Sequence, residues 1–195
     1  MISGLLILIL AGSATPTGGE TTLARLAGDF EAEGGILARH RLLQLPALGE
    51  VLFLEWRDGE GRALRRRLLK VHRDEGGERL EIVLFRDAAE FAALDERPLL
   101  QAALSDADLR RLPESCRVPV ASEEGALRIE LEPGRCRFGE AEAEGELALE
   151  WRIETDGFEY AETWRLGEQA PERLPPEGAL RFRRSRGAGI RAALD

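Results

Sequence analysis

Apolar and polar residues alternate at period two along much of this chain, and this alternation constrains it to a mainly β fold. The pattern is clearest in residues 146–154, where the apolar face consists of Leu147, Leu149, Trp151 and Ile153. Segments of strand length are expected at residues 36–42, 50–56, 63–72, 79–85, 117–121, 126–132, 136–143, 146–154, 158–166 and 178–184. The sequence therefore predicts about ten antiparallel strands.

A sheet of many short strands has to hide its polar edges, and closure into a barrel does so completely. We therefore expect a calyx-like, lipocalin-like antiparallel β-barrel, which at this size can enclose a small ligand. A flat sandwich of two sheets is the alternative architecture. Residues 15–195 have the length of one domain with a substantial core.

Two segments interrupt the β pattern and predict helices. Residues 21–31 place Leu23, Leu26 and Phe30 on one face at helical spacing, so a helix packed across the barrel is expected there. Residues 87–112 predict an insert of two or three short helices. The signals in this insert are two capping-box pairs and a proline that can open a helical turn: Asp87 with Glu90, Ser105 with Asp108, and Pro98.

The first fourteen residues, MISGLLILILAGSA, resemble a secretory signal peptide. Their apolar run, Leu5 to Leu10, is too short to cross a bilayer, which takes about 20 residues. The predicted location is therefore periplasmic or secreted, with a mature chain that begins near Thr15. An uncleaved membrane anchor or a cytoplasmic location is the alternative, because no Lys or Arg precedes the run.

The chain has two cysteines, Cys116 and Cys136. Two cysteines cannot form a four-ligand zinc site, and no Cys-x-x-Cys redox motif is present. In an exported protein we therefore expect a disulfide between them. A simple three-stranded meander would hold them nearly 10 Å apart, so the bridge requires Cys116 to lie in the loop before its strand, or a different strand register.

Composition and motifs exclude several functions. The net charge of −9 argues against general nucleic-acid binding. Serine-hydrolase, zinc-protease and phosphate-loop motifs do not occur. The residues therefore predict no metal, no cofactor and no nucleophile–base pair.

The segment EVLFLEWRDGEGRALRRRL predicts a hairpin with charged residues on its apolar face. If its turn is centred near Glu60, Glu55 lies opposite Arg65, and Phe53 lies opposite Arg67. We therefore expect Glu55, Arg65 and Arg67 inside the barrel, near one mouth. Such an arginine pair suits a ligand carboxylate or phosphate, and a structural ion pair is the alternative.

Three aromatic residues, Trp151, Tyr160 and Trp164, are expected to point inward as well. They serve either as core or as a platform on which a flat conjugated ligand stacks. Four other polar residues are expected to face solvent: His40, Arg66, Lys70 and His72.

Six segments, in this order along the chain, together carry a resemblance to a known family. They are LARLAGDF, VLFLEW, RRRLLKV, the stretch from FRDAAEF to LPESC, GRCRF and GALRFRR. Together they resemble the CpcT/CpeT family, the T-type phycobiliprotein chromophore lyases. The resemblance covers nearly all of residues 15–195. The segment WRIETDGF retains Trp151 but lacks the Arg-Gly-Phe-Asp core of the family's Trp-Asp-Arg-Gly-Phe-Asp stretch.

The resemblance implies a calyx-like barrel that binds an open-chain tetrapyrrole (a bilin) and attaches it to a cysteine of a phycobiliprotein-like acceptor. It also implies a homodimer. Two alternatives stay open: an exported calyx that binds a small amphipathic molecule without catalysis, and a structural envelope protein whose barrel is filled. Glu55, Arg65, Arg67, Trp151, Tyr160 and Trp164 are the candidate ligand-binding residues.

Overall fold

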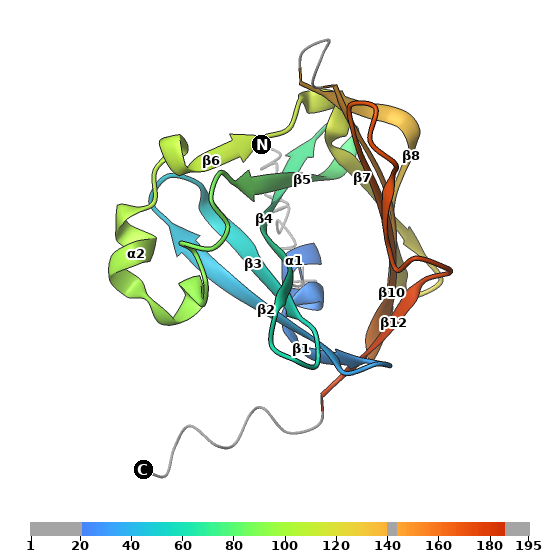
Figure 1. The fold of residues 1–195 in the computed structure, drawn as a ribbon, viewed down its shortest axis with the longest axis horizontal. Helices are drawn as coiled ribbons and strands as arrows, with labels where there is room; N and C mark the ends of the chain where they lie inside the picture. Colours follow the sequence, from blue (N-terminus) through green and yellow to red (C-terminus); the bar gives the residue numbers. More distant parts are fainter. Residues whose placement is uncertain (1–20, 140–143, 186–195) are drawn as a thin grey trace, which may run out of the picture.

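The computed structural model describes residues 21–139 and 144–185, which form a closed antiparallel β-barrel of ten strands (Figure 1). This confirms the predicted fold class over the sandwich. The expected signal peptide and cleavage site lie outside the described residues. Among the helices of the described residues, none has the length and hydropathy of a membrane span.

The barrel strands follow one another around the ring in an order that departs little from the sequence. The order is β10-β12-β1-β2-β3-β4-β5-β7-β8-β9, and pairing of β9 with β10 closes it. The bounds are β1 Gly28–Ala32, β2 Ile36–Leu45, β3 Gly49–Arg57, β4 Ala63–Asp74, β5 Gly77–Phe85, β7 Val118–Glu123, β8 Ala126–Phe138, β9 Gly145–Ile153, β10 Gly157–Leu166 and β12 Leu180–Arg184. Two short strands, β6 Leu109–Arg111 and β11 Glu172–Leu174, pair with β5 and β10 outside this ring.

The predicted N-terminal helix is shorter than expected. Helix α1 spans Thr22–Leu26, capped by the Thr21 hydroxyl, and strand β1 begins at Gly28. Gly28 has a φ of 144°, which an L side chain rarely adopts, so the chain leaves the helix there. Phe30 therefore lies on a strand, yet it is buried as predicted, together with Leu23 and Leu26 on α1.

Strand β8 is continuous where the sequence predicted two strands, 126–132 and 136–143, as far as the structure describes these residues. Leu131 pairs with Leu149, and Cys136 pairs with Leu147, so residues 132–135 bulge out of β8 between these pairs. The sequence of the bulge is Glu-Pro-Gly-Arg. Strand β8 thus keeps its direction where the sequence suggested a turn.

The insert between β5 and β7 packs against the outside of the barrel (Figure 1). It contains 3₁₀ turns at Leu94–Glu96, Asp106–Asp108 and Glu114–Cys116, and helix α2 at Pro98–Ala103. Pro98 opens α2, and the capping box of Ser105 with Asp108 is confirmed. The predicted box of Asp87 with Glu90 instead lies in a turn. The outward apolar side chains of β3–β5 form a second core with the insert: Val51, Phe53, Leu68, Val83, Phe91, Leu94, Leu104 and Leu109.

Candidate functional site at the barrel mouth

The hairpin of β3 and β4 differs from the predicted register by one residue. Glu55 pairs with Arg66, and Arg65 pairs with Trp56, because the register shifts between Trp56 and Arg57. A one-residue slip moves a side chain to the opposite face of a sheet. The expectation that Glu55 lies inside the barrel with Arg65 and Arg67 was therefore wrong for Glu55.

The two arginines do point into the barrel, and both bind a glutamate of β10. Arg67 Nη2 donates to Glu162 Oε2 at 2.7 Å, and Arg65 Nε donates to Glu162 Oε1 at 3.2 Å. The side chains of Glu162 and Arg67 are 0% and 4% exposed, and that of Arg65 is 16% exposed. Arg65 also lies 3.4 Å from Glu172, whose side chain is exposed. We call the barrel end that holds Arg65, opposite α1, the mouth.

Glu55 lies on the outer face, under the insert, in an ionic cluster of its own. Arg66 Nη2 and Arg57 Nη2 donate to its two carboxylate oxygens at 2.5 and 3.0 Å. Burial opposes ionisation of Glu55, but the hydrogen bonds from Arg66 and Arg57 outweigh burial and hold the pKa of this carboxyl below its ordinary value. Arg39 joins Glu55 to Asp95 of the insert. This cluster fastens the insert to the barrel wall, which is a structural role.

The three aromatic candidates lie on neighbouring strands that face inward. Trp151 and Tyr160 pair across β9 and β10 and are 1% and 2% exposed, whereas Trp164, nearer the mouth, is half-buried. The Trp151 Nε1–H is buried and has no hydrogen-bond partner among the described residues. A buried donor without a partner is costly, so an acceptor beside it would stabilise the barrel.

His40 is fully buried in the aromatic centre of the barrel, so the prediction that it faces solvent was wrong. Its Nε2 accepts a hydrogen bond from Trp56 Nε1 at 2.9 Å, and its Nδ1 lies 2.8 Å from the carbonyl oxygen of Leu26. These contacts fix a neutral ring that donates from Nδ1. Burial, with Arg41 and Arg184 nearby, lowers the pKa of His40 to about 3.

The residues predicted as a solvated basic face are also more involved than expected. Arg66 is buried against Glu55, and the His72 ring lies 2.6 Å from Glu81 and is 28% exposed. Lys70 is half-buried.

The disulfide between Cys116 and Cys136 is present, with a Cα–Cα distance of 4.4 Å. Cys116 lies in the 3₁₀ turn before β7, which is one of the two arrangements that were expected to allow the bridge. Both sulfur-bearing side chains are buried in the barrel core.

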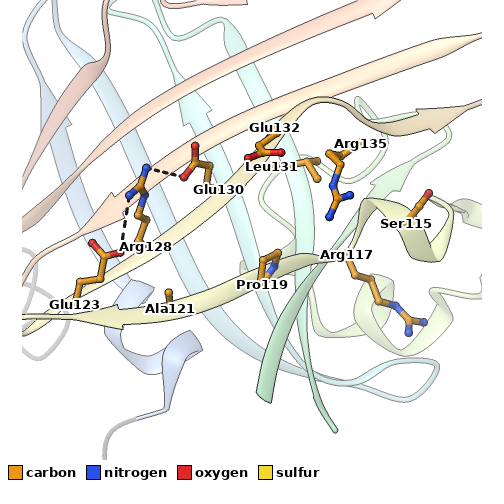
Figure 2. Close-up of a pocket in the computed structure, with 10 residues that line it drawn as sticks. All are labelled: Ser115, Arg117, Pro119, Ala121, Glu123, Arg128, Glu130, Leu131, Glu132 and Arg135. Atoms are coloured by element: carbon orange, nitrogen blue, oxygen red, sulfur yellow. Dashed lines mark ion pairs between the residues drawn. The ribbon is translucent and has the colours of Figure 1, made fainter. Parts of the chain in front are cut away.

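The described hollows lie on the surface of the protein rather than among the inward aromatic rings. The one in Figure 2, of about 340 Å³, lies over the outer face of β7 and β8. Inside the barrel, rings of β1, β3, β10 and β12 pack closely, with centroids 4.6 Å apart for Trp56 and Tyr160 and 4.4 Å apart for Phe158 and Phe182. The barrel is therefore largely filled between α1 and the mouth.

Glu162 is the functional candidate that the sequence reasoning missed. It occupies the inward position between Tyr160 and Trp164, so it is the one carboxylate on an otherwise apolar strand face. A charged residue in an apolar period-two series is the signal that could have identified it.

No family model and no curated protein matches the chain. Among solved structures, the selenomethionine form of the CRL protein of Arabidopsis is similar, with a TM-score of 0.60 and 16% identical residues. The similarity covers 83% of this chain and 94% of that chain. At this identity the comparison shows the fold alone.

Proposed function

We propose that the barrel binds a small amphipathic molecule, and that the arginines at the barrel mouth hold a carboxylate group of this molecule. The proposal rests on one observation: two inward arginines, Arg65 and Arg67, share one buried glutamate, Glu162. Two guanidinium groups with one buried carboxylate leave positive charge in an apolar surrounding, and an anionic ligand group offsets it. Exposed Glu172 meets only the outer arginine, Arg65, at 3.4 Å.

An open-chain tetrapyrrole is the ligand that the resemblance to CpcT/CpeT proteins suggests. Its propionate groups suit the arginines, and its conjugated plane would stack on the half-buried Trp164, whereas Tyr160 and Trp151 lie deeper and are 2% and 1% exposed. Because the residues offer no nucleophile–base pair, we assign the protein the task of holding the chromophore. A cysteine of a phycobiliprotein-like acceptor would then add to it. A homodimer, as implied by the same resemblance, is part of this proposal.

The proposed site of action is the periplasm or the cell exterior. The buried disulfide is compatible with an oxidising compartment, and the first fourteen residues supply the export signal in this proposal. A phycobiliprotein acceptor would instead require action in the cytoplasm, so the binding function fits export better than the transfer function does.

A scaffold without a ligand is the second candidate. The close packing of aromatic rings inside the barrel supports it, because a filled interior leaves little room for a bilin beyond the mouth. In this case, Arg65, Arg67 and Glu162 form an internal brace between β4 and β10.

Absorbance titration of the purified protein with biliverdin, phycocyanobilin and haem separates these candidates. We expect a red-shifted, protein-bound bilin spectrum that Arg65→Gln and Arg67→Gln weaken by about tenfold or more. Arg66→Gln is the matched control, because Arg66 is equally buried and glutamate-paired but faces outward. Loss of binding in Arg66→Gln alone, or no binding at all, would favour the scaffold. Transfer of bilin to a phycobiliprotein subunit is required for the lyase assignment.

A further inference from the structure

A gap opens on the outer face of the barrel where β7 leaves β8. The first residues of β7 pair with β5, Pro119 opposite Arg79, whereas the residues from Val120 onward pair with β8. The facing part of β8 is the bulge of residues 132–135. Because the two strands separate there, outward side chains from β5, β7 and β8 converge on one depression.

Three arginines line this depression, which consists of two adjoining hollows of about 340 and 390 Å³. Both hollows are lined by Ser115, Arg117 and Arg135, and the larger also by Arg79. Figure 2 shows the Arg135 guanidinium directed from the bulge of β8 into the gap above β7. Ser115 adds a hydroxyl donor at the same place.

The disulfide fixes the relative positions of these groups. Ser115 and Arg117 flank Cys116, and Arg135 precedes Cys136, so the bridge ties the two stretches of chain together at a Cα–Cα distance of 4.4 Å. Both cysteines point into the core. The bridge therefore holds the backbone of Arg117 near that of Arg135.

The carboxylates around the depression neutralise these arginines only in part. Arg117 pairs with Glu114 at 2.7 Å, but the side chain of Glu114 is 77% exposed. Arg79 comes no closer than 3.8 Å to Asp74, so this pair is long. Arg135 enters no ion pair within the described part of the chain. Glu132 also lines the smaller hollow, and so do Glu123 and Glu130, which pair with Arg128. Exposed pairs of this kind contribute little stability, and an incoming anion can replace them.

We propose that Arg79, Arg117, Arg135 and Ser115 form a binding site for the phosphate group of a phosphate ester, assembled by the disulfide. Guanidinium groups that approach from three strands or turns suit an oxyanion with several acceptor oxygens better than a planar carboxylate. The hollows exceed the size of a phosphate ion, so the ester's organic part lies along β7 beside Pro119 and Ala121. This site is independent of the mouth.

The test is a titration with phenyl phosphate at constant ionic strength, followed by backbone and arginine side-chain NMR. We expect resonances of residues 115–117 and 135 to shift, and benzoate to bind more weakly. Arg117→Gln and Arg135→Gln should each weaken binding by about fivefold or more. Arg152→Gln should not weaken it, because Arg152 lies on the outer face of the neighbouring strand β9, lines neither hollow and is paired with Glu154 at 3.2 Å.

The double variant Cys116→Ser/Cys136→Ser, checked for folding by circular dichroism, should bind phenyl phosphate more weakly than the oxidised protein. Competition by vesicles that contain phosphatidylglycerol, but not by pure phosphatidylcholine vesicles, would assign the phosphate to a lipid headgroup. Absence of such competition would assign it to a soluble ester. The proposal is overturned if the resonances of residues 115–117 and 135 do not move, or if Arg152→Gln weakens binding as much as Arg135→Gln. Bilin binding at the mouth should be the same in all these variants.

Discussion

Protonation of His40 should control the stability of the barrel between pH 6.5 and 4.5. The pKa of His40 is about 3 in the folded protein and about 6.5 when the chain is unfolded, so only the unfolded chain takes up the proton in this range. The contribution of neutral His40 to the free energy of unfolding is therefore fully present above pH 6.5, and it is lost progressively as the pH drops below this value. Each pH unit removes about 1.4 kcal/mol, which amounts to about 2.7 kcal/mol at pH 4.5.

Carboxylates with a lowered pKa act in a different range. The contribution of Glu55 is present above its ordinary pKa of 4.5 and is lost only below it. The chain has only two histidines, and the second, His72, is partly exposed beside Glu81. The pH dependence above 4.5 can therefore be attributed by replacing one histidine at a time.

The assay is urea unfolding followed by tryptophan fluorescence at pH 7.0 and 4.5 for the wild type, His40→Gln and His72→Gln. Glutamine can accept from Trp56 and donate to Leu26, so the first variant should fold, with less stability at pH 7. It should lose most of the pH dependence, whereas His72→Gln should retain it. An undiminished pH dependence in His40→Gln, or an NMR titration of His40 near pH 6.5, would refute the reasoning.

Three further predictions follow from the core. Glu162→Gln leaves the buried Arg67 without a carboxylate and leaves Arg65 with only the exposed Glu172, so it should lower the free energy of unfolding by about 3–5 kcal/mol in urea titrations; a loss below about 1 kcal/mol would mean that the arginines reach solvent. The native protein should show no titratable thiol, and replacing both Cys116 and Cys136 should lower the free energy of unfolding by about 3 kcal/mol; free thiols in the native protein would contradict the bridge. Gly157→Ala should prevent stable closure, because the added Cβ would overlap the carbonyl oxygen of Phe182; a melting temperature equal to that of the wild type would contradict this.

The strand count of ten was correct partly because two errors offset each other. Strand β1 was mistaken for helix, since Leu23, Leu26 and Phe30 satisfy helical spacing and face the core in both conformations. Strand β8 was divided in two, since Pro133 and Gly134 are typical of a turn. Local composition does not distinguish a bulge from a turn, because the pairing partner on β9 decides which one forms.

Only part of the candidate site was predicted correctly, and strand pairing is again the reason. Alternation placed Arg65, Arg67, Trp151 and Tyr160 inside correctly, because the pairing is uninterrupted along β9 and β10 and along β4 from Arg65 onward. Glu55 was misplaced, because the irregularity at Trp56 is a property of the β3–β4 pairing that composition does not reveal. The partner of the arginines, Glu162, lies 95 residues from Arg67 along the chain, so local sequence patterns could not pair them.

The pairing of β1 with β12 has a consequence for how the protein is made. It sets Phe30 opposite Arg184, so the seam of the barrel joins segments that are among the most distant in the described chain. Contacts of such large sequence separation form slowly, because the entropy of a long loop is lost before they add stability. While residues 180–184 are still in the ribosome, β1 and β10 remain open edges that can pair with other chains. Holding the nascent chain unfolded until synthesis has passed this point would therefore protect it from aggregation.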